Sequence, residues 1–252
     1  MGVRPGVTPP LNPHSMWKGE SVMRSFARLY PSLAILLLLT APAFAQNQYR
    51  FEVFGAVNLP KDKDFQIGLP QFSPPVSGAH KYSEGARGGI RVGVDFKKHW
   101  GEDIIYSYGS NATKIVNSTG GSEFPFTVRS HQFAVNALWY PAGLDSDKKI
   151  YPYLTAGGGG TFFVVSPETV NNAAEMGLGK LHTENVFAFN AGGGIRAQLS
   201  RRFGFRVDAR DYMTRTPRFG LPEHSDDPTA LVFPTSGVFH QIEVSFAFVY
   251  YF

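Results

Sequence analysis

Residues of the types found in a hydrolase triad stand together at His224-Ser225-Asp226-Asp227. In such a triad a serine nucleophile needs a histidine base beside it and a carboxylate that orients the histidine. Four consecutive residues cannot reach that geometry by themselves, and a polar run of this kind is typical of a solvated loop. We therefore interpret this segment as a loop.

Two further patterns suggest phosphate or metal binding, but their spacing does not fit. The run Ala156-Gly157-Gly158-Gly159-Gly160 lacks the Gly-Lys-Ser/Thr ending of phosphate-binding loops. We expect it in a strand, where glycine permits tight packing or leaves room for bulky neighbours. Glu168, Glu175 and Glu184 supply carboxylates for a divalent cation, but their spacing matches no known binding loop. The chain has no cysteine, and the sequence predicts no cofactor and no metal.

The strongest chemical pattern is a set of six arginines and five acidic residues on one face of the predicted strands. An isolated buried charge is costly, so a closed interior needs charges of both signs that can pair. We interpret the set as an ion-pair network in the lumen of a barrel, with a conduction path as the alternative. Its members are Arg50, Glu52, Arg87, Arg91, Asp95, Asp103, Arg196, Arg206, Asp208, Arg210 and Glu243.

These charges share a face because the segments that carry them alternate polar and apolar residues with the period of a β-strand. In one segment, for example, Ile90 and Val92 oppose Arg91. From residue 46 onward we find eight such segments and no convincing helical pattern. The predicted strands are Tyr49–Asn58, Ala86–Lys97, Asp103–Thr113, Arg129–Tyr140, Tyr151–Val164, Asn185–Leu199, Gly204–Tyr212 and Gly237–Phe252.

The connections and the aromatic residues decide which face points outward. Connections 59–85, 114–128, 165–184 and 213–236 are long, and those between them are short, as in membrane barrels with long external loops and short periplasmic turns. Ten aromatic residues fall at the short-turn ends and indicate a girdle at a membrane interface. They are Tyr49, Phe96, Trp100, Trp139, Tyr140, Tyr151, Phe203, Phe205, Tyr250 and Phe252. The sequence therefore predicts an all-β, eight-stranded antiparallel up-and-down transmembrane barrel, with a soluble barrel around an apolar cavity as the alternative.

The N-terminal sequence predicts that the protein is exported from the cytoplasm. Arg24 and Arg28 precede the apolar run 33–39, and Ala43-Phe44-Ala45 resembles a signal-peptidase site. We expect a signal peptide over 23–45, cleavage between Ala45 and Gln46, and the barrel over 46–252. Residues 1–22 are interpreted as an extension ahead of a translation start at Met23, with Met1 and Met16 as alternatives. Without residues 1–45 the chain carries 20 Lys or Arg against 19 Asp or Glu, which does not favour nucleic-acid binding.

Three stretches carry a resemblance to a known family. They are Tyr151–Gly160, Asn190–Arg196 and Phe205–Tyr212, and they resemble the outer-membrane β-barrel domain family of Gram-negative bacteria, in particular its small OmpA- and OmpX-like barrels. The C-terminal segment also resembles the signal that the barrel assembly machinery reads, with Ala247 where glycine is usual. The matching positions are Ser245, Ala247, Tyr250 and Phe252.

This resemblance implies an outer-membrane location, contact with membrane lipid and lipopolysaccharide, and partners in the assembly machinery and periplasmic chaperones. It also implies a non-enzymatic structural or surface role, such as envelope integrity, adhesion or stress protection through the external loops. A narrow pore is one alternative. Another is a lipid A deacylase-like enzyme that uses Ser130 and His131. Loop 59–85, with Lys61-Asp-Lys-Asp64 and a proline-rich 70–75, is a candidate contact for an external ligand, which the sequence does not identify.

Overall fold

The computed structural model describes residues 48–67, 76–96, 98–117, 123–144, 148–175, 181–220 and 237–252, all within the compact unit Gln46–Phe252. The expected signal peptide and its cleavage site, including Ala45 and Gln46, lie outside the described residues, as does His224–Asp227. The strands are β1 (Gln48–Pro60), β2 (Lys63–Ile67), β3 (Val76–Tyr82), β4 (Gly85–Phe96), β5 (Trp100–Asn117), β6 (Glu123–Trp139), β7 (Ile150–Val165), β8 (Glu184–Gln198), β9 (Phe203–Arg215) and β10 (Val238–Tyr251), and the helix is α2 (Pro167–Glu175).

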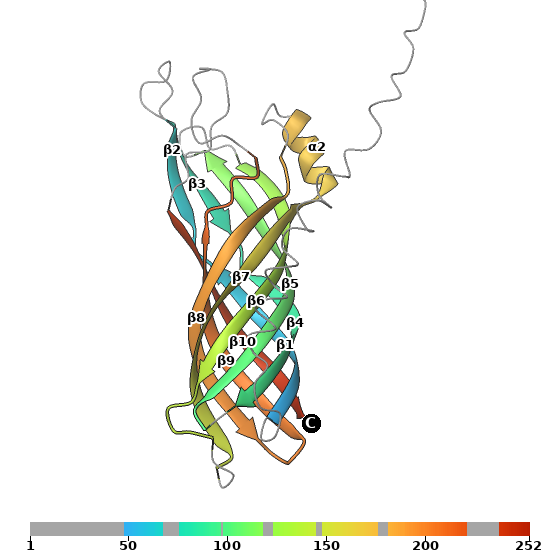
Figure 1. Cartoon of the computed structure of the whole chain (residues 1–252). Coiled ribbons are helices and arrows are strands. Elements are labelled where there is room, and N and C mark those ends of the chain that lie inside the picture. Colours follow the sequence, from blue (N-terminus) through green and yellow to red (C-terminus); the bar gives the residue numbers. More distant parts are fainter. Residues whose placement is uncertain are drawn as a thin grey trace, which may run out of the picture. The chain divides into compact units, whose positions relative to one another are not determined.

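Eight of these strands close into a barrel (Figure 1). Around the barrel the order is β1, β4, β5, β6, β7, β8, β9 and β10, and every neighbouring pair is antiparallel. The ring closes where β10 pairs with β1, from Arg50 opposite Tyr251 to Pro60 opposite Gln241. Closure leaves none of the eight without two hydrogen-bonded neighbours. The predicted eight-stranded antiparallel barrel is confirmed.

The long-loop end carries structure that the sequence analysis missed. Figure 1 shows β2, β3 and α2 at this end, opposite the C-terminus. The predicted loop 59–85 contains the hairpin β2–β3, and β3 pairs with the upper part of β5, beyond the point where β4 stops. Strands β5 and β6 are correspondingly longer than predicted at this end.

Helix α2 corrects the expectation that no helix follows residue 46. Ser166 caps it, because the Ser166 hydroxyl accepts the backbone N–H of Thr169 at 3.2 Å, and Pro167 occupies the first helical position. A helix of nine residues is too short for its periodicity to stand out. The Ser-Pro-Glu start was the signal that could have revealed it. Among the described residues, no helix is long and apolar enough to cross a membrane.

The alternation along each strand divides the barrel into an apolar exterior and a charged interior. Large apolar side chains such as Val53, Phe246 and Val207 are exposed on the outside, while the arginines beside them in sequence are buried. A continuous exposed apolar band of this kind requires lipid to cover it. The outward face therefore meets the membrane, and the alternative of a soluble barrel around an apolar cavity does not hold.

The aromatic girdle at the short-turn end is smaller than predicted. Trp100, Trp139 and Phe203 point outward, as expected. Tyr140 and Tyr151, which we assigned to the girdle, are buried in the lumen instead. Both stand at a strand end, where one residue decides the phase and the pattern is too short to fix it.

Replacing Val207 by Arg tests the outward face. Val207 is 49% exposed on β9. Four residues from Phe203, at ~3.3 Å each along a strand tilted by about 45°, place it about 9 Å inside the girdle. An arginine facing lipid near the midplane should lower the free energy of unfolding by about 2–4 kcal/mol. Urea unfolding in bilayers of matched thickness measures this, with Val207→Leu as control. Equal stability of the two variants would contradict a lipid-facing Val207.

Candidate functional site

The eleven charged residues predicted for the lumen all lie inside the barrel, and none is more than 4% exposed. They come from β1, β4, β5, β8, β9 and β10. Because successive side chains of a strand point to opposite faces, residues two apart share the lumen, as Arg206, Asp208 and Arg210 do on β9. The structure brings the set together into three connected groups along the barrel.

The central group is organised around Arg206. Its guanidinium lies 3.0 Å from a carboxylate oxygen of Glu52 and 3.0 Å from one of Asp103. Asp208 lies 3.1 Å from Arg206, 3.0 Å from Arg91 and 2.9 Å from Arg210. Each carboxylate therefore contacts more than one guanidinium, which offsets the cost of removing these charges from water.

The lower group lies toward the short-turn end. Asp95 pairs with Arg50, and it lies 2.7 Å from Arg196. The hydroxyl of Tyr140 donates to Asp95 at 3.0 Å and accepts from Arg196 at 2.9 Å. The Arg196 guanidinium also lies 4.9 Å from the centre of the Tyr140 ring, within cation–π range. Tyr140 is thus part of the network, which explains its inward orientation.

The upper group contains fewer charges. Arg87 lies 3.5 Å from Glu243, donates to the Ser130 hydroxyl at 3.0 Å, and contacts Gln132. Ser130 therefore faces the lumen. His131 faces outward and lies 3.0 Å from the Tyr106 hydroxyl through its Nδ1. The two residues of the proposed deacylase pair are on opposite faces of β6, so they do not form a catalytic pair with each other.

Two of the ion pairs join opposite walls of the barrel. In a ring of eight strands, β9 and β5 are four strands apart, and so are β8 and β4. The pairs Arg206–Asp103 and Arg196–Asp95 connect these walls directly at 3.0 and 2.7 Å. Side chains therefore meet across the full width of the lumen at two levels, as expected for a barrel that side chains can just fill.

Glycine on the lumen face makes room for these bulky groups. A Cβ at Gly93 would lie 2.5 Å from a guanidinium nitrogen of Arg50. At Gly194 it would lie 2.2 Å from the Val207 carbonyl oxygen and 2.7 Å from the Tyr153 hydroxyl. The run Gly157–Gly160 lies within β7, and a Cβ at Gly159 would strike the backbone of β6, 1.8 Å from the Phe133 carbonyl oxygen. Close strand packing explains that run.

An apolar cluster, called the cap below, lies at the long-loop end of β6, β7 and β8. Ala173 of α2 packs there against side chains from β6, β7 and β8. We define the cap as Val128, Phe163, Val165, Ala173, Leu181, Val186 and Phe219.

Glu184 holds part of the cap in place. Its carboxylate accepts the backbone N–H of Arg218 at 2.5 Å and that of Phe219 at 2.7 Å, and it pairs with Arg215 at 3.1 Å. Phe219 has a φ of 54°, a left-handed conformation that costs a bulky residue about 1–2 kcal/mol. The Glu184 contacts offset that cost and direct the Phe219 ring to Phe163, with centroids 6.3 Å apart.

The three glutamates considered as cation ligands do not form one cluster in the structure. Glu168 and Glu175 belong to α2, whereas Glu184 begins β8 and is engaged by backbone N–H groups. Within the described part of the chain, no group of three or more His, Asp or Glu side chains could hold a metal ion. Of the C-terminal positions, Ser245 and Ala247 are buried on the lumen side, while Phe252 is exposed and stacks with Tyr49 and Tyr250.

Known proteins share this architecture. A sequence profile of the outer membrane protein beta-barrel domain matches residues 32–251. The solved structure of the outer membrane protein OprG from Pseudomonas aeruginosa is similar, with a TM-score of 0.52 and 13% identity over 82% of this chain and 96% of that one. Neisserial surface protein A aligns with a TM-score of 0.44 and 11% identity over 82% and 97%. No curated protein matches the sequence. At these identities the similarity to solved structures concerns the fold alone.

Replacing Asp208 by Asn tests the ion network. The change removes the carboxylate shared by Arg91, Arg206 and Arg210 and leaves an excess of buried positive charge. We expect a loss of about 3–5 kcal/mol in the free energy of unfolding. The matched control is Asp211→Asn on the same strand, because Asp211 pairs with His240 on the outside and both side chains are about one third exposed. That control should cost about 1 kcal/mol or less. Urea unfolding of both variants would contradict the network if Asp211→Asn were the more damaging change.

Proposed function

The chain belongs to the outer membrane protein beta-barrel domain family, and we propose that its barrel is a closed anchor that presents interaction structures outside the cell. The family and the fold locate it in the outer membrane of Gram-negative bacteria. The proposed role is structural or interactive, in envelope integrity, adhesion or stress protection. The external loops would make the contacts, and the barrel would hold them in place.

One observation carries this proposal. Ion pairs connect opposite walls of the lumen at the levels of Arg206 and Arg196, and the apolar cap packs at the long-loop end of β6, β7 and β8. A path for ions or small molecules would need these side chains to separate, which would expose buried charges without partners. A barrel filled in this way supports anchoring better than conduction.

The structure of the long-loop end supports the proposal that the barrel presents interaction structures. Strands β5 and β6, of 18 and 17 residues, rise beyond the end of β4, and the hairpin β2–β3 continues the sheet there. The carboxylate of Asp62 accepts the backbone N–H of Tyr82 at 3.0 Å and braces the base of the hairpin. A braced hairpin loses less entropy on binding than a free loop, so it suits recognition of a partner.

We also propose the partners of biogenesis that the C-terminal pattern suggests. Phe252 is exposed directly after β10, and Tyr250 lies beside it on the lipid face. These two aromatic side chains are therefore accessible to an assembly factor before the barrel closes. Lipid and lipopolysaccharide would contact the exposed apolar band.

Conductance tests the closed barrel. Purified refolded protein in planar bilayers with 1 M KCl should give no discrete current steps, whereas a known porin in the same bilayer should. Reproducible steps from the wild-type protein would overturn the anchor proposal and favour the narrow pore.

Replacing residues 61–84 by a four-residue turn tests the surface role. The eight barrel strands keep all their pairings with one another, and only the pairing of upper β5 with β3 is lost, so the variant should fold and keep its heat-modifiable gel migration. In a strain that lacks the native gene, it should restore neither attachment to host-cell monolayers nor growth in deoxycholate, whereas the wild-type chain should restore at least one. Full restoration by a folded variant would count against an interaction role for the hairpin.

Deleting Phe252 tests the assembly proposal. We expect the folded fraction in the outer membrane to fall more than it does on replacement of 61–84, because the terminal aromatic contact is lost. Gel migration of unheated membrane samples measures this, with Phe246→Leu, a change within the same outward row, as control. An unchanged folded fraction would contradict a role for Phe252 in assembly.

A further inference from the structure

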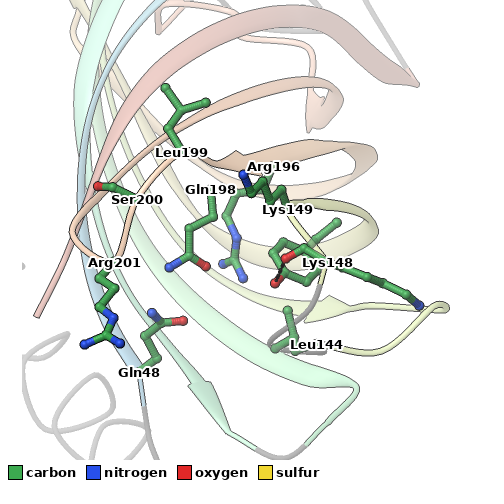
Figure 2. Close-up of a pocket in the computed structure, with 10 residues that line it drawn as sticks. Gln48, Leu144, Lys148, Lys149, Arg196, Gln198, Leu199, Ser200 and Arg201 are labelled. Atoms are coloured by element: carbon green, nitrogen blue, oxygen red, sulfur yellow. Dashed lines mark hydrogen bonds between the residues drawn. The ribbon is translucent and has the colours of Figure 1, made fainter.

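A pocket of about 590 Å³ opens at the short-turn end of the barrel. It lies between the β6–β7 turn, the β8–β9 turn and the start of β1 (Figure 2). None of the described residues that line it is acidic, although the β6–β7 turn also contains Asp145 and Asp147, which are outside the described residues. The lining residues used below are Gln48, Lys148, Lys149, Arg196, Gln198 and Arg201.

The inner wall of the pocket offers hydrogen-bond donors. Figure 2 shows the side-chain amides of Gln48 and Gln198 converging with the guanidinium of Arg196. Arg196 is 1% exposed, and its guanidinium is engaged by Asp95 and by the Tyr140 hydroxyl. The two glutamine amides beside it carry N–H groups, and a phosphate oxygen is a strong acceptor for such donors.

The outer wall of the pocket carries positive charge. Lys148, Lys149 and Arg201 are exposed at its rim, and Lys98 and Arg202 stand exposed on the turns around it. In the sequence, turns 97–99, 140–149 and 199–202 contain six Lys or Arg against two Asp. The long connections 61–84, 118–122, 166–183 and 216–237 contain five against eight. The barrel is therefore basic at one end and acidic at the other.

The basic turns lie at the depth of lipid headgroups. Arg202 directly precedes Phe203, and Lys98 stands two residues before Trp100, both of which belong to the outward girdle. Aromatic girdles mark the boundary between hydrocarbon and headgroups, so the next residues outward meet the phosphates. Short turns of outer-membrane barrels face the periplasm, where the leaflet consists of phospholipids.

We propose that this pocket binds the headgroup of an anionic phospholipid of the periplasmic leaflet. The phosphate accepts hydrogen bonds from the two glutamine amides at the inner wall, while Lys148, Lys149 and Arg201 supply the attraction. Each basic residue near an anionic surface contributes about fivefold to binding, which corresponds to about 1 kcal/mol. Removing three of them should weaken binding by about a hundredfold at low ionic strength, and less at physiological salt.

The experiment measures lipid retained by the refolded full chain. Protein in a neutral detergent is mixed with phosphatidylglycerol or phosphatidylcholine, and bound lipid is counted by native mass spectrometry. The test variant is K148Q/K149Q/R201Q. The control is K61Q/K81Q/R129Q, which removes the same charge from exposed residues toward the long-loop end. Heat-modifiable migration shows that both variants are folded.

The wild-type and control proteins should retain phosphatidylglycerol in preference to phosphatidylcholine, and the test variant should lose that preference. Equal retention of phosphatidylglycerol by all three proteins, or an equal loss of retention in both variants, would contradict the proposed binding site. A further arm adds inorganic phosphate. Binding of phosphate alone, without preference between the two lipids, would overturn the lipid assignment.

Discussion

The contact between Arg206 and Asp103 is the interaction on which the rest of the barrel interior depends. It joins strands that are four apart in a ring of eight, at 3.0 Å, and so fixes the distance between opposite walls. A wider barrel would separate the two charges, and a buried charge without its partner is strongly destabilising. Strand number, glycine positions and the inward tyrosines can all be understood as ways to let this contact and its neighbours form. Gly194, for example, leaves space for the Tyr153 hydroxyl, which donates to Asp208 at 3.0 Å.

Much of this architecture could be predicted from the sequence. Polar and apolar residues alternate over strands such as Gly204–Tyr212, and this alternation predicts both where a strand lies and which of its side chains point into the lumen. The partners could not be predicted. Alternation places Arg206 and Asp103 in the lumen, but their pairing depends on the stagger of strands that are far apart in sequence. The short elements could not be predicted either. The five residues of β2 and the nine of α2 are too few for a reliable period, and Tyr140 and Tyr151 stand at strand ends where the phase changes.

The two ends of the barrel differ in chemistry. At the long-loop end, Glu184 holds part of the apolar cap, and the sheet continues into a braced hairpin. At the short-turn end, the lower ion group borders an open basic pocket that contains Arg196. Arg196 thus belongs both to the filled interior and to the wall of that pocket. The lumen network therefore extends to the wall of the pocket at the short-turn end.

Closure between the first and last strands also sets an order in time. Glu52 of β1 pairs with Arg206, 154 residues later, and the seam beside β1 is completed only by β10. Until β9 has arrived, Glu52 and Asp103 lack their Arg206 partner, and until β10 has arrived, the edge of β1 has no neighbour on that side. A chain that began to close early would bury unmatched ions, so the same charges that hold the finished barrel together oppose partial folding. Complete pairing of the interior charges therefore depends on the presence of the last two strands.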